Sequence, residues 1–478
     1  MDYTLEVPRL ALLTLLFSLA LSAADKPNIV ILLADDLGFH DVGFHGGEIR
    51  TPNIDKLAEE GVQLERFYVH PVCSPTRAGL MTGRYPIRFG SMRAVYPPWR
   101  KGGLDPAEKT IADGLAAAGY EHRGVFGKWH LGHSDVKYHP LRRGFTEFFG
   151  HYNGAIDYFT HEREGELDWH SGYEAAHDEG YSTDVVASKA ADFIKRHASD
   201  GPYLCYVPFN APHSPFQALE ADMDPYRTLE AVPGKWGADA QRRKNRRILG
   251  GMIAALDRGV GTILSAIDAS GERDDTLVLF LSDNGGVGGI SSNYPLRGAK
   301  ASVFEGGIRV PAAVHWPAAF KGGRKTSSPM ANIDVMPTML AAAGVKGAPG
   351  KPLDGRNLLD VWSGQTERMG RELYNYIGQQ GEDSEQVSVI TPEWKLVVIG
   401  PPVNKPEVDT PKREVYLFKI ERDPNENENV ADEHPVIVDW LMAKAREFRS
   451  LQPANAVPPY NEGKEGFKAP KEWRLPGQ

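Results

Sequence analysis

Continuous hydrophobic runs that end in polar residues are the main pattern in the first three-quarters of the chain. Asn28–Asp36 reads NIVILLADD and Thr276–Gly286 reads TLVLFLSDNGG, and each run closes with polar side chains. Runs without polar alternation are typical of strands buried on both faces of a sheet. Helical patterns lie between such runs, the clearest being TIADGLAAAGY, Asp184–His197 and about Arg246–Ile267. Strands that alternate with helices predict an α/β fold with a largely parallel sheet.

The pattern changes after about Trp362. Short apolar stretches (QVSVI, WKLVVIG and REVYLFKI) lie between turn residues, and a helical pattern covers Pro435–Leu451. Short strands separated by turns predict a small antiparallel sheet, here accompanied by one helix. We therefore predict a large domain over residues 25–365 and a small α+β domain over residues 366–478, with an extended tail from Gln452.

The N-terminus carries a separate signal. Leu10–Leu21 is an apolar run of about a dozen residues followed by Ser22, Ala23 and Ala24, which is typical of a signal peptide over residues 1–24. The alternative is a membrane anchor, but the run is shorter than the ~20 residues needed to span a bilayer. No other stretch resembles a span, so we predict an exported protein. The chain has no Asn-X-Ser/Thr site, which favours a bacterial periplasmic or secreted protein.

Charge and cysteine content narrow the candidate partners. The chain has 54 Lys and Arg against 63 Asp and Glu, a net charge of −9, which makes nucleic acid an unfavourable partner. An anionic substrate would need a local basic pocket. Of the two cysteines, Cys205 lies in the apolar run PYLCYVPF and is expected to be a core thiol. Cys73 lies in the polar stretch HPVCSPTRAGLMTGRYP, where a core role is less natural.

Polar side chains follow several of the predicted strands. In open α/β sheets, ligands bind beyond the carboxyl ends of the strands. Pairs or single residues at these ends are Asp35 with Asp36, Asp283 with Asn284, Lys128 with His130, and His213. The four oxygen-bearing side chains favour Ca²⁺ or Mg²⁺ over zinc, although acids at strand ends also serve as simple caps.

The segment that begins at Cys73 is the second candidate for chemistry. If a helix starts there, Pro75 suits its first turn and Arg77 lies one turn from Cys73 on the same face. The N-terminus of that helix would favour an anion. A chance thiol and a cysteine nucleophile of low pKa remain alternatives at this point.

These motifs resemble a known family. CSPTRAGLMTGRYP and GKWHLG are similar to the two signatures of the formylglycine-dependent (type I) sulfatases, and the resemblance covers nearly the whole chain after residue 24. It is strongest to the arylsulfatase B or N-acetylgalactosamine-4-sulfatase group. The resemblance implies an alkaline-phosphatase-like fold, with a large mixed sheet between helices and a small C-terminal α+β domain.

The resemblance also implies a mechanism. A maturation enzyme would convert Cys73 to formylglycine, an aldehyde whose hydrate attacks the sulfur of a sulfate ester and whose second hydroxyl then expels sulfate. One Ca²⁺ per chain would be held by Asp35, Asp36, the modified Cys73, Asp283 and Asn284.

Further roles implied by the resemblance fall on basic side chains. Arg77 would pair with the formylglycine hydrate and the metal-binding acids, and Lys128 would hold a sulfate oxygen. His130 would take the proton that starts sulfate release. His213 would protonate the leaving oxygen or bind sulfate beside it, and Lys300 would neutralise sulfate.

The segment GHYNGAIDYFTHE matches a stretch that lies near the sugar in arylsulfatase B-like enzymes. It carries Tyr152, Asn153, Asp157 and His161, and aromatic and hydrogen-bonding side chains suit a sugar. A sugar with a galactose-type ring sulfated at O4 is the expected substrate. The alternative is a surface loop whose aromatic residues pack on the core.

Two other functions compete with a sulfatase. A phosphonate or phosphodiester hydrolase of the same superfamily would commonly use Thr or Ser with two zinc ions and histidine ligands, but neither ADD nor SDNGG contains histidine. A non-catalytic sulfated-glycan binding protein would not need all the predicted catalytic residues. We therefore expect a sulfuric ester hydrolase.

Overall fold

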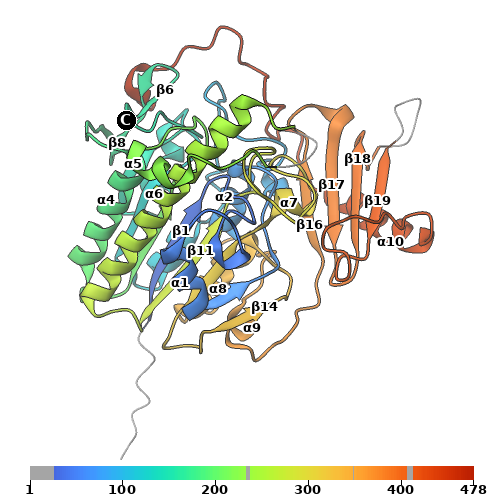
Figure 1. Cartoon of the computed structure of the whole chain (residues 1–478), viewed down its shortest axis with the longest axis horizontal. Coiled ribbons are helices and arrows are strands. Elements are labelled where there is room, and N and C mark those ends of the chain that lie inside the picture. Colours follow the sequence, from blue (N-terminus) through green and yellow to red (C-terminus); the bar gives the residue numbers. More distant parts are fainter. Residues whose placement is uncertain (1–25, 233–236, 348, 406–412, 478) are drawn as a thin grey trace, which may run out of the picture.

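The computed structural model describes residues 26–232, 237–347, 349–405 and 413–477 (Figure 1). The predicted signal peptide lies outside the described residues. The large domain is built on one ten-stranded mixed sheet. In spatial order its strands are β14 (Arg324–Thr326), β2 (Val62–Leu64), β13 (Ala312–His315), β11 (Thr276–Ser282), β1 (Asn28–Ala34), β10 (Tyr203–Pro208), β4 (His122–Lys128), β5 (Glu147–His151), β8 (His170–Ser171) and β9 (Glu174–Ala175).

The five central strands, from β11 to β5, are parallel, and β13 and β8 pair antiparallel on either side of them. Every residue of β1 is buried, which agrees with the continuous apolar run. The predicted α/β fold with a largely parallel core is therefore confirmed, and the antiparallel outer strands make the sheet mixed.

Helices cover both faces of this sheet, because alternate residues of β1 belong to two different cores. Ile29, Ile31 and Leu33 pack in one core, and Val30 and Leu32 pack in the other. The first core is covered by α2 (Cys73–Thr82), α3 (Ile111–Ala117), α8 (Val335–Ala342) and α9 (Leu359–Ser363). The second is covered by α1 (Pro52–Glu60), α4 (Ser182–His197) and α6 (Ala240–Ser270), with α5 (Glu220–Met223) against α6.

The small C-terminal unit is a four-stranded antiparallel sheet with one helix against it (Figure 1). Its elements are β16 (Leu373–Ile377), β17 (Glu385–Ile390), β18 (Lys395–Gly400), β19 (Glu414–Phe418) and α10 (Pro435–Arg449). The antiparallel sheet and the helix agree with the sequence pattern. The predicted boundary after residue 365 falls between α9 and β16.

This small sheet shares its core with the large domain. Tyr85 and Ile87 of the large domain pack in one cluster with Leu373 and Val387. A three-stranded sheet adjoins it, formed by β12 (Arg309–Val310), β3 (Phe67–Tyr68) and β15 (Met330–Ala331), with the short helix α7 (Glu305–Ile308) beside β12. The two parts are therefore joined by buried apolar surface rather than by a flexible linker.

The C-terminal tail returns to the large domain. In Figure 1 it passes from the small sheet over the molecule to the neighbourhood of β6 (Glu162–Arg163), where the chain ends. The backbone N–H of Tyr460 donates to Gln379, and the short helix η8 (Lys471–Trp473) packs on β7 (Glu166–Leu167). Trp473 is 1% exposed. The extended tail predicted from Gln452 is thus anchored along its course.

Among the described residues, only α6 is long and apolar enough to cross a membrane by length and composition. Of its most apolar window, 61% is buried inside the fold. A core helix of a globular domain has the same character, and α6 packs closely on α4.

Buried neutral histidines should make stability depend on pH. The imidazole of His70 donates through Nδ1 to Asn375 of β16 at 2.9 Å, and its other nitrogen has no hydrogen-bond partner among the described residues. Burial lowers the pKa of His70 to about 4. The unfolded chain, with a histidine pKa of ~6.5, therefore binds more protons between pH 6.5 and 4, and the stability present above pH 6.5 falls as pH drops through that window.

Urea unfolding at several pH values checks this expectation. His70→Gln should reduce the slope of unfolding free energy against pH by up to about 1.4 kcal/mol per pH unit between pH 6.5 and 4. The exposed His177→Gln is the matched control and should leave the slope as it is. An unaltered slope in His70→Gln would show that His70 does not contribute to the pH dependence of stability.

Candidate functional site

Two neighbouring strands bring the predicted acids together. In the parallel pair of β1 and β11, Ala34 lies opposite Ser282, so the residues that follow each strand meet at the same edge. Asp35, Asp36, Asp283 and Asn284 are each at most 1% exposed. The side-chain amide of Asn284 donates to Asp36 Oδ1 at 2.7 Å. The structure thus brings together all four oxygen-bearing side chains that the sequence predicted.

Helix α2 delivers the cysteine and the arginine to these acids. Cys73 is its first residue, and Sγ lies 3.5 Å from Asp35 Oδ1. One turn on, Arg77 donates from Nε and Nη2 to Asp283 Oδ2 at 3.0 and 2.8 Å, and from Nη1 to the Lys128 carbonyl. Burial, together with Asp283 and Asp35, raises the pKa of the Cys73 thiol far above its usual range.

Each buried carboxylate has a cation beside it. Lys128 contacts Asp35, and Arg77 contacts Asp283. The third carboxylate, Asp36, is 2.7 Å from Lys300 Nζ. Three acids are thus balanced by three bases, which such deep burial of charge requires. Burial and the charge of Asp35 raise the pKa of Asp283 to about 6, whereas Lys300 and His213 outweigh burial and lower the pKa of Asp36.

Two histidines each have one ring nitrogen hydrogen-bonded to a backbone carbonyl, and the other ring nitrogen makes no hydrogen bond to a described residue. His130 Nε2 lies 3.1 Å from the Tyr96 carbonyl, which can only accept, so the proton is on Nε2. No described residue bonds to its buried Nδ1. The Nδ1 of His213 donates to the Ser214 carbonyl at 2.5 Å, and its Nε2 is 3.7 Å from Asp36 Oδ2. Burial and nearby cations lower both pKa values, that of His213 to about 3.

The acid cluster (Asp35, Asp36, Asp283 and Asn284) has the composition of a site for a hard metal ion. Ligand atoms of Asp35, Asp36, Cys73 and His213 lie within 4.8 Å of one another. Within the part of the chain that the structure describes, the buried Oδ1 of Asn284 has no hydrogen-bond partner, so one oxygen ligand is left over. Mostly oxygen donors suit Ca²⁺ or Mg²⁺. A divalent cation would change the locally neutral cluster to a positive one, which would attract an anion.

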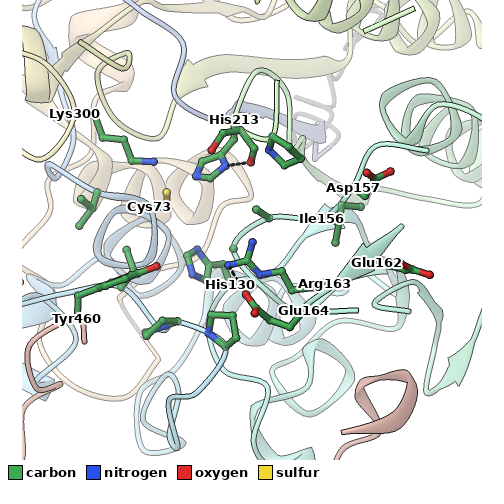
Figure 2. Close-up of a pocket in the computed structure, with 18 of the residues that line it drawn as sticks. Cys73, His130, Ile156, Asp157, Glu162, Arg163, Glu164, His213, Lys300 and Tyr460 are labelled. Carbon is green, nitrogen blue, oxygen red and sulfur yellow. Dashed lines mark hydrogen bonds and ion pairs between the residues drawn. The ribbon is translucent and has the colours of Figure 1, made fainter. Parts of the chain in front are cut away.

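Four side chains around the acid cluster form the floor of a pocket of about 610 Å³ (Figure 2). Cys73, His130, His213 and Lys300 line it, whereas Arg77 and Lys128 lie buried behind them. Side chains that the sequence did not predict complete the walls: Arg163, Glu164, Gln379 and Tyr460. No motif marks them, because they come from a short hairpin, a loop and the tail, which only tertiary packing brings to the pocket.

The predicted sugar-binding segment is placed only partly at the pocket. Asp157 lines it, but its carboxylate accepts from the backbone of Phe159 and Thr160 and from Gln217. Asn153 and His161 are buried away from the lining. The side-chain amide of Asn153 donates to Asp168. The ring of His161 stacks on Trp169, and its Nε2 donates to the Gly180 carbonyl. Tyr152 stacks on His170.

Gly154, in the same segment, does reach the site. A Cβ at position 154 would lie 2.5 Å from Cε1 and Nε2 of His130. The backbone can therefore pack against the imidazole ring only because this residue is glycine. The contacts of this segment therefore show a structural role for Asn153 and His161, and the substrate role stays a prediction.

Comparisons with known families cover most of the chain. Residues 27–345 match the family model described as "Sulfatase", and residues 299–448 match "N-sulphoglucosamine sulphohydrolase, C-terminal". Arylsulfatase J of Mus musculus is 30% identical, over 92% of this chain and 78% of the relative. N-acetylgalactosamine-6-sulfatase of Homo sapiens is 32% identical, over 85% of this chain and 82% of the relative.

Solved structures agree in fold. The crystal structure of Ps i-CgsB, also determined in complex with k-i-k-neocarrahexaose, superposes with a TM-score of 0.80 at 29% identity, over 92% of this chain and 96% of that one. A phosphonate monoester hydrolase of Agrobacterium radiobacter superposes with a TM-score of 0.62 at 20% identity, over 90% and 97%, a likeness of fold alone.

Metal binding should be visible as thermal stabilisation. We expect Ca²⁺ in excess to raise the melting temperature by a few degrees, because it binds the folded cluster and not the unfolded chain. Asp36→Asn should abolish this increase, and asparagine tolerates the positive φ of 65° at this position.

A second buried acid provides the control for that measurement. Asp334 is paired with Arg371 at 2.6 Å, in a separate ion pair from those of the acid cluster. Asp334→Asn should lower the melting temperature and still respond to Ca²⁺. Repeating the titration with Mg²⁺ identifies the preferred ion, and no response to either would refute the metal site.

Proposed function

The chain belongs to the sulfatase family and is a sulfuric ester hydrolase, and on that premise we propose that it desulfates a carbohydrate sulfated at O4 of a galactose-type ring, using formylglycine at position 73 and one Ca²⁺. Relatives named N-acetylgalactosamine-6-sulfatase and a structure bound to k-i-k-neocarrahexaose support a sulfated glycan as the substrate class. The observation that carries the proposal is Cys73 at the pocket floor, beside three carboxylates and three cations.

Asp35, Asp36, Asp283 and Asn284 would hold the metal, with residue 73 completing the set. When bound, Ca²⁺ supplies polarisation of a sulfate oxygen and lowers the pKa of a neighbouring hydroxyl. Arg77 keeps Asp283 oriented through its two hydrogen bonds, and the bond to the Lys128 carbonyl fixes the end of β4 next to it.

The nucleophile requires Cys73 as a precursor. Formylglycine supplies a hydrated aldehyde with two hydroxyls, one for attack on sulfur and one for release of sulfate. His130 has the geometry of a proton acceptor, because its Nε2 proton is committed to Tyr96 and Nδ1 is bare. Its lowered pKa keeps it neutral, and therefore able to accept, at neutral pH.

His213 and Lys300, on the opposite wall of the pocket, would assist the departure of the leaving oxygen. His213 directs Nε2 towards the pocket because Nδ1 is fixed on Ser214, and Lys300 lies beside it. Lys300 lowers the pKa of His213, and the negative charge of a bound sulfate would oppose that effect. A site that is neutral without metal and positive with it favours the growth of negative charge on sulfate during the reaction.

Maturation and export complete the proposal. Cys73 is 2% exposed and every residue of α2 is buried, so a formylglycine-generating enzyme would act before the chain has folded. The signal peptide predicted over residues 1–24 would direct the chain to the periplasm or the exterior.

Conversion of Cys73 can be measured directly. We expect mass spectrometry of the tryptic peptide Phe67–Arg77 from active enzyme to show an aldehyde in place of the thiol. Cys73→Ser should retain at most a trace of aryl sulfate turnover, because a serine has no second hydroxyl to expel sulfate. The other cysteine, Cys205, lies inside β10, so Cys205→Ala should keep its activity. Full activity with an unmodified Cys73 would disprove the proposal.

Substrate choice should favour one sulfate position. Buried hydrogen-bonding groups discriminate strongly when a partner hydroxyl is displaced. We therefore expect kcat/KM for galactose or N-acetylgalactosamine 4-sulfate units to exceed that for the 6-sulfates by about tenfold or more. A panel of defined oligosaccharides, with an aryl phosphonate as the comparison for the rival activity, measures this. A preference for the 6-sulfates would refute the proposed specificity for O4. A preference for the phosphonate would refute the sulfatase assignment for the site.

A further inference from the structure

The outer wall of the pocket carries a charged hairpin that the catalytic chemistry does not use. Strands β6 and β7 pair antiparallel, and the turn between them consists of Glu164 and Gly165. In Figure 2 the side chain of Arg163 points into the pocket, on the side of His130, whereas the carboxylate of Glu162 points outward. A dashed line joins Arg163 to Glu164, which also lines the pocket.

The hairpin is held in place from both sides. On one side, the backbone N–H of Asp157 donates to the Glu162 carbonyl at 2.9 Å. On the other, the C-terminal tail contributes the Trp473 indole, which donates to the Arg163 carbonyl at 3.0 Å. The backbone of Glu472 donates to the side chain of Glu166 at 3.0 Å. The backbone that positions Arg163 is therefore pre-organised by residues about 300 positions away in sequence.

The turn keeps a glutamate where other residues would be less strained. Glu164 has a φ of 53° and is followed by Gly165 at 79°. Two-residue hairpin turns with both φ values positive favour Asn-Gly or Gly-Gly, and a left-handed glutamate costs about 1 kcal/mol or more. Strain of this kind tends to persist where a side chain has a use.

Arg163 has hydrogen-bond donors to spare. Its Nε is buried without a partner, and within the described part of the chain its guanidinium forms an ion pair with Glu164 at 3.4 Å. The two side chains are 25% and 42% exposed, and such pairs contribute at most about 1 kcal/mol. A guanidinium presents a planar pair of donors that matches a sulfate or a carboxylate.

We propose that Arg163 binds a second anionic group of the substrate, a sulfate or a carboxylate on the sugar adjacent to the one that is desulfated, and that Glu164 opposes it. This inference rests on the proposed function. The cations near Cys73 come from β4, α2 and the loop before α7 and would serve the reacting sulfate, whereas Arg163 comes from the outer hairpin. A pocket of about 610 Å³ has the size of sites that enclose a whole small ligand rather than one sulfate.

Three disaccharides test the inference. Each carries the reacting sulfate at the position that the oligosaccharide panel selects, and the adjacent sugar is neutral, sulfated or a uronate. Wild-type kcat/KM should be higher for one or both anionic disaccharides than for the neutral one. Arg163→Gln should lower this ratio about tenfold, mainly through KM, and Arg163→Lys should restore part of it. Glu164→Gln should raise the ratio, because it removes a competing carboxylate.

Opposite effects of Arg163→Gln and Glu164→Gln on this ratio would distinguish recognition of charge from a structural role. Arg196→Gln removes the same charge at the far end of α4, where Arg196 pairs with Glu147, and should leave the ratio unaltered. Equal ratios in wild type and Arg163→Gln would overturn the inference alone, whereas hydrolysis of aryl sulfate but of none of the disaccharides would overturn the proposed carbohydrate substrate. Failure to hydrolyse any sulfate ester would instead overturn the proposed function.

Discussion

The burial of three carboxylates at one edge of the central sheet is the constraint on which the rest of the site depends. Such a cluster would repel itself in a low-dielectric interior, and the fold tolerates it because Lys128, Arg77 and Lys300 each lie beside one acid. The bases come from β4, α2 and the loop before α7. The acid cluster thus ties the parallel strands to the helix that carries Cys73.

The sequence predicted this inner part of the site well, for a physical reason. Continuous apolar runs identify buried parallel strands, and residues that follow such strands must meet at one edge. Asp35 and Asp283 can therefore be placed at the same edge of the sheet from the sequence pattern, and the resemblance to the sulfatases then assigned them to one site. The helix beginning at Cys73 was also predictable, because Pro75 suits its first turn and Arg77 follows at one turn's distance.

The outer part of the site was not predictable in the same way. Tyr460 belongs to the irregular tail and Arg163 to a strand of two residues, which is too short for a periodic pattern. Their positions follow from tertiary contacts such as the burial of Trp473. The segment around Asn153 shows the opposite difficulty. Its polar residues suit a sugar by type, yet Asp168 and Trp169 bind two of them inside the fold. Residue type alone could not separate a ligand contact from an internal one.

Because the C-terminal tail forms part of the pocket wall, the residues of the pocket are completed only late in synthesis. A ribosome adds ~5–20 residues per second, so roughly 20 to 80 s separate the synthesis of Cys73 from that of Tyr460. In the last part of this interval, after Lys300 has been added, the chain holds all the residues of the pocket floor but not Tyr460 of the wall. Until the last segment has been synthesised, the pocket therefore lacks the part of its wall that Tyr460 forms.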